Sequence, residues 1–177
     1  FRLGKNMSVR LPSGPEYASQ VEKEQYWLPK LAPHLPLAIP KPIALGKPTQ
    51  EYPWHWSIYQ WLDGTTAAVG QIEKLKDFAA SLANFLKALQ KYNTTGAPIA
   101  SPENFYRGGP LSVYNNDTQK AIGKLNDKNL AATLTTIWKK ALASNWQNNP
   151  VWIHGDIAAG NLLVNNGKLS AVIDFGQ

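Results

Sequence analysis

Residues 151–177, VWIHGDIAAGNLLVNNGKLSAVIDFGQ, contain two apolar runs that are separated by the tetrapeptide NNGK. An Asn-Gly pair favours the positive backbone angles of a tight turn, so the two runs predict a β-hairpin. The polar stretch HGDIAAGN forms the loop that leads into the hairpin. Because a hairpin brings the residues that flank its outer ends together, we expect Asn161 and Asp174 to be neighbours, with Asp156 on the loop beside them.

These three polar side chains indicate a particular chemistry. Carboxylate and carboxamide oxygens are hard ligands, which suit Mg²⁺ rather than a transition metal. With one Asp and the Asn on the metal, the second Asp remains free to accept a proton. Because Mg²⁺ commonly binds substrate phosphates, the group predicts phosphoryl transfer from a nucleoside triphosphate to a hydroxyl. A single Asp in a loop is usually a turn former or a helix cap, so the prediction depends on the combination.

The stretch HGDIAAGN followed by IDFG resembles the Asp-(four residues)-Asn and Asp-Phe-Gly signatures of the protein-kinase-like fold. Its His-Gly-Asp form is similar to that of the aminoglycoside phosphotransferase family, which also includes choline and homoserine kinases. The resemblance implies an α+β, protein-kinase-like two-lobe fold. Residues 1–62 would be a partial antiparallel β lobe with one helix and the nucleotide-binding hinge. Residues 63–177 would be a partial, mainly helical C-terminal lobe with the catalytic loop and the metal-binding hairpin.

The same resemblance implies roles for individual residues of the closing stretch. Asp156 would be the catalytic base, or would at least orient the acceptor hydroxyl. Asn161 and Asp174 would hold Mg²⁺ against the phosphates of ATP or GTP, and His154 would brace the loop without reacting.

The resemblance extends upstream over most of the chain. SVRLP resembles the strand that carries the phosphate-binding cation, which places Arg10 where the fold usually has Lys. VEKEQYWLPKL resembles the following helix, whose Glu24 would pair with that cation. IYQWLDG is similar to the family's hinge, where the backbone at Gln60 and Leu62 would contact adenine. Without the resemblance, Glu24 can be interpreted equally well as a solvated surface carboxylate. Arg10 can be interpreted as an exposed charge on an edge strand.

The remaining segments alternate between strand and helix patterns. FRLGKNMSVRLP predicts two strands joined by a turn, and WSIYQWL predicts another strand after a proline-rich segment. Apolar residues recur at steps of three and four over 15–31, with Ser13 as the N-cap, and over 69–92. A further helical region covers 117–146 and is broken near Asn126.

The composition excludes several classes of protein. The 177 residues contain no Cys, which excludes disulfides, thiolate catalysis and Cys-ligated zinc. The net charge of +6 suits an anionic partner such as a nucleotide, but the basic residues are scattered, so we expect no nucleic-acid binding. The charged start is unlike a signal peptide and no apolar segment could span a bilayer, so we expect a cytoplasmic protein without a membrane partner.

We therefore predict a small-molecule kinase that transfers the γ-phosphate of ATP or GTP to a hydroxyl of an aminoglycoside, another amino alcohol or a sugar. The chain would be the central fragment of this enzyme and inactive alone, because the loop that covers the triphosphate and the helices that bind the acceptor would lie outside it. A non-catalytic nucleotide-binding module of the same fold is the alternative.

Overall fold

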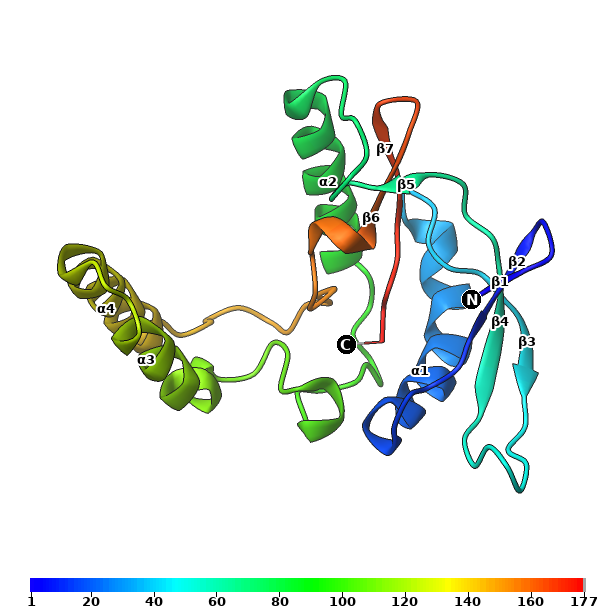
Figure 1. The fold of residues 1–177 in the computed structure, drawn as a ribbon, viewed down its shortest axis with the longest axis horizontal. Helices are drawn as coiled ribbons and strands as arrows, with labels where there is room; N and C mark the ends of the chain where they lie inside the picture. Colours follow the sequence, from blue (N-terminus) through cyan, green and yellow to red (C-terminus); the bar gives the residue numbers. More distant parts are fainter. Residues whose placement is uncertain (177) are drawn as a thin grey trace. The chain divides into compact units, whose positions relative to one another are not determined.

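The computed structural model describes residues 1–176, which form two compact units (Figure 1). The first unit comprises residues 1–97 and the chain from Val151 onward, and the second comprises Pro98–Pro150. The first unit contains β1 (Arg2–Leu3), β2 (Met7–Arg10), α1 (Pro15–Leu31), a 3₁₀ turn (Ala32–His34), β3 (Pro42–Gly46), β4 (Trp56–Gln60), β5 (Thr65–Thr66), α2 (Leu75–Gln90), a second 3₁₀ turn (Ala159–Asn161), β6 (Leu162–Asn165) and β7 (Lys168–Val172).

A four-stranded antiparallel sheet with the order β1-β2-β4-β3 begins the first unit. The alternation in β4 buries Ser57 and Tyr59 on one face, and α1 packs against β3 and β4. As the periodicity predicted, α1 covers Pro15–Leu31, and it continues through Pro29. Its N-cap is Gly14 rather than Ser13, because the backbone is extended at Gly14 and already helical at Pro15.

The second sheet has the order β5-β6-β7, and its hairpin is the one predicted from the NNGK tetrapeptide. Asn166 and Gly167 have φ angles of 49° and 74°, which is the pairing of a type I′ turn. Residues 162–164 and 171–172 of this hairpin are buried, and α2 packs against β7. One core cluster therefore joins the hairpin to α1, β4 and α2.

The helix predicted over 69–92 begins later, at Leu75. The amides of Val69 and Gly70 bond to the carbonyl of Thr66, and the Glu73 amide bonds to the carbonyl of Gly167. These bonds hold the segment before α2 in turns against the hairpin. The predicted start of the helix at residue 69 was wrong, because contacts with the hairpin outweigh the helical periodicity at this end of α2.

Gly167→Ala is expected to destabilise the protein more than Gly96→Ala does. Both glycines have φ angles near the left-handed region, 74° and 72°, so alanine at either site adds about 1–2 kcal/mol of backbone strain. A Cβ at Gly167 would also lie 2.7 Å from the Cβ of Glu73, whereas one at Gly96 would meet nothing within 4 Å. The overlap adds about 1 kcal/mol or more. Urea unfolding of both variants measures the difference, and equal losses would contradict the close approach.

The second unit contains two 3₁₀ turns (Pro102–Asn104 and Leu111–Tyr114) and the helices α3 (Asn115–Gly123) and α4 (Lys128–Ala143). The break predicted near Asn126 is present, because Asp127 caps α4 by accepting hydrogen bonds from the amides of Asn129 and Leu130. The Trp138 indole donates to the side chain of Asn115 and thereby ties α4 to α3. No helix among residues 1–176 is long and apolar enough to cross a membrane.

Candidate active site

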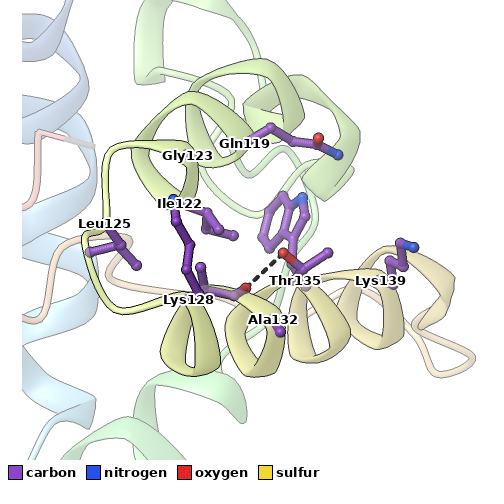
Figure 2. A pocket seen from close by; sticks show the side chains of 10 residues that line it. Gln119, Ile122, Gly123, Leu125, Lys128, Ala132, Thr135 and Lys139 are labelled. Atoms are coloured by element: carbon purple, nitrogen blue, oxygen red, sulfur yellow. Dashed lines mark hydrogen bonds between the residues drawn. The ribbon is translucent and has the colours of Figure 1, made fainter.

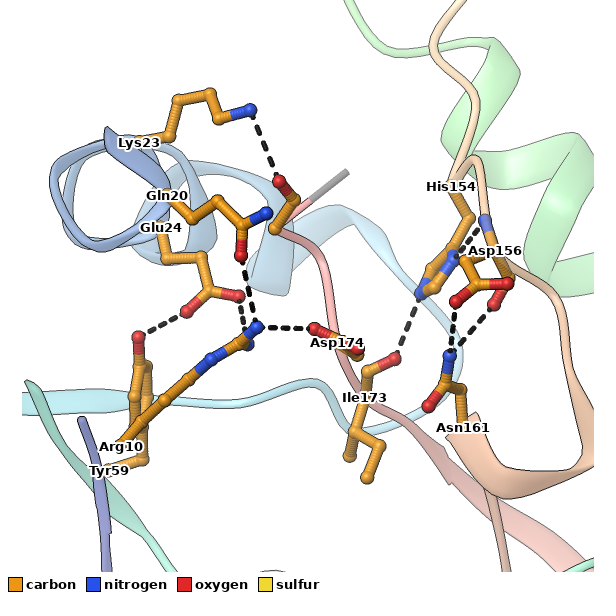
Figure 3. Close-up of polar contacts among 11 residues, drawn as sticks. Arg10, Gln20, Lys23, Glu24, Tyr59, His154, Asp156, Asn161, Ile173 and Asp174 are labelled. Atoms are coloured by element: carbon orange, nitrogen blue, oxygen red, sulfur yellow. Dashed lines mark hydrogen bonds and ion pairs between the residues drawn. The ribbon is translucent and has the colours of Figure 1, made fainter. Parts of the chain in front are cut away.

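His154 fixes the loop that precedes the hairpin (Figure 3). Its imidazole is buried, Nε2 donates to the carbonyl of Ile173 at 3.0 Å, and Nδ1 accepts from the amide of Asp156 at 3.2 Å. These partners require the neutral tautomer with a proton on Nε2. Burial lowers the pKa of His154. The hydrogen bond to the Ile173 carbonyl and the charges of the nearby Asp174 and Asp156 oppose this decrease only in part. Both ring nitrogens are occupied, so His154 holds the loop to β7.

Asp156 and Asn161 lie at the two ends of a short turn. The Nδ2 amide of Asn161 donates to the backbone carbonyl of Asp156 at 3.0 Å and to its Oδ2 at 3.2 Å. The side-chain nitrogen of Asn161 therefore faces Asp156. This leaves the side-chain oxygen Oδ1 of Asn161 free to accept a hydrogen bond or to bind a metal. Both side chains are only partly buried, so both are accessible to a ligand.

Asp174 follows β7 at the outer end of the hairpin. The Ile173 amide donates to the Asn161 carbonyl at 2.9 Å, so the residue before Asp174 pairs with Asn161. Among residues 1–176 no hydrogen bond joins the Asp174 side chain to Asn161 or Asp156. Asp174 has a φ angle of 67°, an uncommon value for a residue other than glycine and one often found at functional sites. Its Oδ1 accepts a hydrogen bond from Nη2 of Arg10 at 2.7 Å.

Arg10 connects Asp174 to helix α1. Its Nη1 pairs with Glu24 Oε1 at 2.8 Å, and the Glu24 side chain is only 2% exposed. β1 pairs only with Met7 and Ser8 of β2 and does not reach Arg10, but the Arg10 guanidinium is held in ion pairs with Glu24 and Asp174 and is not a solvated charge. The readings of Glu24 as a solvated carboxylate and of Arg10 as a solvated edge charge are therefore wrong. Burial opposes the charge of Arg10, but Glu24 and Asp174 outweigh burial and raise its pKa.

Two further residues contact this ion pair, and sequence reasoning missed both. The Tyr59 hydroxyl donates to Oε2 of Glu24, and Oε1 of Gln20 accepts from Nη2 of Arg10 at 3.2 Å. Gln20 lies four residues before Glu24, on the same face of α1, and this spacing could have identified it. Tyr59 comes from β4, which no local pattern links to α1.

The expected hinge residues lie at the end of β4. The Gln60 amide donates to the Lys41 carbonyl at 2.9 Å, and the Trp61 amide donates to the Asn6 carbonyl. Within residues 1–176 the backbone of Leu62 makes no hydrogen bond. The N–H of Gln60 is thus bonded within the first unit, whereas neither backbone group of Leu62 has a partner within residues 1–176.

A pocket of about 300 Å³ lies between α3 and α4 in the second unit (Figure 2). Ile122, Leu125 and Trp138 supply its apolar lining, and Lys128 and Lys139 supply charge. It contains none of the site residues predicted from sequence. Among residues 1–176, no three His, Cys, Asp or Glu side chains cluster closely enough to hold a metal by themselves.

A family model described as the phosphotransferase enzyme family matches residues 1–177. No curated protein matched the sequence.

Several solved structures are similar to this chain. The complex of APH(2")-IIia with GDP and kanamycin has a TM-score of 0.70 at 21% identity, covering 97% of this chain and 61% of the other. Macrolide 2'-phosphotransferase MphH from Brachybacterium faecium has a TM-score of 0.64 at 21% identity, with coverage of 96% and 58%. ADP-bound aminoglycoside phosphotransferase APH(2'')-Ib has a TM-score of 0.59 at 18% identity, with coverage of 98% and 60%. This chain therefore shares the fold of these proteins and spans about three fifths of their length.

Proposed function

Because the chain belongs to the phosphotransferase enzyme family, we propose that its protein is a small-molecule kinase that moves the γ-phosphate of a nucleoside triphosphate to a hydroxyl group. One observation carries the proposal. The hairpin brings Asp156 and Asn161 to the outer end of β7, where Asp174 meets Arg10 of β2. A proton acceptor, two oxygen ligands and a phosphate-binding cation, all from one compact unit, are the parts that phosphoryl transfer requires.

The donor set at Asn161 and Asp174 fits Mg²⁺. The hydrogen bonds of Asn161 leave its Oδ1 free, and Asp174 offers a partly exposed carboxylate. Two protein oxygens together with substrate phosphates and water are typical of Mg²⁺ sites. When bound, Mg²⁺ would neutralise charge that develops on the phosphates.

In the proposed reaction, Oδ2 or Oδ1 of Asp156 accepts the proton of the acceptor hydroxyl. The hydroxyl oxygen forms the new bond to the γ-phosphorus as the bond to the β-phosphate oxygen breaks, which yields a phosphorylated acceptor and a nucleoside diphosphate. Arg10 binds the phosphates, and Glu24 keeps Arg10 in place. His154 holds the Asp156 amide and so sets the direction of the loop.

Nucleotide binding is proposed for residues 1–62, and catalysis and metal binding for residues 63–177. The Leu62 backbone would pair with the edge of the base, and the carbonyl of Gln60 would be the second contact. Two of the similar solved structures contain a nucleotide, GDP in one and ADP in the other, which supports a nucleotide site that accepts either purine. Dependence on a nucleoside triphosphate and Mg²⁺ is in keeping with a cytoplasmic enzyme.

The acceptor is proposed to be an aminoglycoside, a macrolide or a related hydroxyl compound, since the similar structures carry these compounds in their names. The test is an acceptor panel assayed by nucleoside diphosphate release, with the whole protein that contains this chain, Mg²⁺, and ATP or GTP. We expect release to depend on one acceptor class and to stop when EDTA removes Mg²⁺. Nucleotide binding without release across the whole panel would instead favour the non-catalytic nucleotide-binding module.

A further inference from the structure

Arg10 can bind phosphate effectively only when its side chain is held still. An Arg side chain has about 2 kcal/mol of rotamer entropy, and its planar fork binds well only in a suitable orientation. In this structure Nη1 donates to Glu24, and Nη2 donates to Gln20 and Asp174 (Figure 3). The proposed function also assigns the Asp174 carboxylate to the metal, so Glu24 and Gln20 are the two contacts whose only part in the site is to orient the guanidinium.

Glu24 in turn depends on Tyr59. Its Oε1 is bound to Arg10 and its Oε2 accepts the Tyr59 hydroxyl, so both oxygens of this buried carboxylate have partners. Burial raises the pKa of Glu24, while Arg10 and the Tyr59 hydrogen bond oppose the increase. Burial and the charge of Glu24 raise the pKa of Tyr59, so the hydroxyl keeps its proton and donates it. Removal of the hydroxyl would leave a buried oxygen unsatisfied and loosen Glu24.

The strand register explains why Tyr59 can reach this pair. β2 and β4 are antiparallel neighbours in which Arg10 lies opposite Ser57. Side chains two residues apart on a strand share a face, so Tyr59 projects from the same face as Arg10. Helix α1 packs on β4, and its Glu24 meets both side chains.

Gln20 is the second residue that holds Arg10. It is only 2% exposed, and its Nε2 has no hydrogen-bond partner among residues 1–176. The opposite amide orientation would aim an NH₂ group at a guanidinium donor, so Arg10 sets the orientation of the amide. A buried unpaired donor costs about 1–3 kcal/mol, which an apolar residue would avoid. The contact with Arg10 accounts for an amide at this position, and a neutral acceptor adds no negative charge that would repel phosphate.

We propose that Tyr59 and Gln20 are positioning residues for Arg10: Tyr59 acts through Glu24, and Gln20 acts directly on the guanidinium. Together they hold the cation in the orientation in which it meets the nucleotide phosphates. Such preorganisation strengthens binding because the ordering has occurred before the ligand arrives. The inference rests on the proposed nucleotide site.

The test is calorimetry of the whole protein with Mg²⁺ and the β,γ-imido analogues of ATP and GTP. We expect Tyr59→Phe to raise Kd about fivefold and Gln20→Met about threefold, as the loss of one buried hydrogen bond implies. Gln20→Met should leave the unfolding midpoint unchanged or raise it, because it removes an unpaired buried donor. Weaker binding without lower stability is an outcome that a merely structural role would not produce. The matched control is Tyr52→Phe, which removes a Tyr hydroxyl bonded to the Pro12 carbonyl outside the site, and its Kd should stay within about twofold of wild type.

A second background tests whether the effect passes through Arg10. The double variant Arg10→Met/Glu24→Gln removes both charges together and so avoids a buried unpaired charge. In this background Tyr59→Phe should leave Kd unchanged, and an undiminished fivefold effect there would overturn the inference. If Tyr59→Phe and Gln20→Met each bound the analogues with the wild-type Kd, the inference about Arg10 would also be wrong. The proposed function would not be affected by that result. Failure of the wild-type protein to bind either analogue would instead refute the nucleotide site itself.

Discussion

Asp156→Asn is expected to lower kcat about 10²–10⁴-fold, the usual contribution of a positioned proton acceptor. The amide has nearly the shape of the carboxylate, and its oxygen can still accept the hydrogen bond from Nδ2 of Asn161. It cannot take up the proton of the acceptor hydroxyl. Because the backbone carbonyl of Asp156 also holds Asn161, the loop should keep its shape and KM should change little. Steady-state kinetics of the whole protein with its acceptor measure both constants.

Two variants separate this effect from loss of structure. Asp156→Ala removes the hydrogen bond to Asn161 as well as the base, so it should lose at least as much kcat as Asp156→Asn. Asp77→Asn removes a carboxylate from an exposed position of α2 and should leave kcat unchanged. If Asp156→Asn turned over at the wild-type rate, the assignment of Asp156 as the base would be wrong.

Replacing Arg10 is expected to have the second largest effect, and the effect should fall on the nucleotide. Arg10→Lys keeps the positive charge, but one ammonium group cannot reproduce the fork that meets Glu24, Gln20 and Asp174. We expect kcat/KM for the nucleotide to decrease about tenfold, equivalent to about 1.4 kcal/mol of lost transition-state stabilisation. Arg10→Met should decrease it further and also destabilise the fold by about 3–5 kcal/mol, because Glu24 is left buried without a charge partner.

Kinetics and urea unfolding should be measured on the same preparations of these variants. The double variant Arg10→Met/Glu24→Gln should recover much of the stability lost in Arg10→Met but none of the nucleotide affinity. Recovery of both would show that Arg10 serves the fold alone and has no part in phosphate binding.

Much of the geometry of the hairpin and of the polar loop before it could be derived from the sequence because that geometry is local. The Asn-Gly turn sets the register of the pairs next to it, Asn165–Lys168 and Val164–Leu169. A register shift between Leu163 and Val164, which the sequence did not predict, then places Asn161 opposite the residue before Asp174. Helix α1 could be predicted from local sequence in the same way, since the amphipathic spacing over Pro15–Leu31 defines a helix whatever packs against it. The predicted roles of Asp156 as base and of Asn161 and Asp174 as metal ligands await the experiments above.

The surroundings of Arg10 could not be derived in this way. Arg10 and Asp174 are separated by 164 positions, and Tyr59 and Glu24 by 35, so no periodicity records either contact. The start of α2 at Leu75 has the same origin, because a bond from Glu73 to the hairpin turn replaces the first helical turns.

The sequence by itself therefore determined the hairpin, its polar loop and the type of chemistry they suit, because backbone preference and side-chain spacing act over a few residues. Only the tertiary structure decided that Glu24 is buried and that Tyr59 and Gln20 hold Arg10 in place. The physical reason is that the energy of a charge depends on the solvent and the partners around it, and these are brought together only when α1, β2, β4 and β7 pack into one unit.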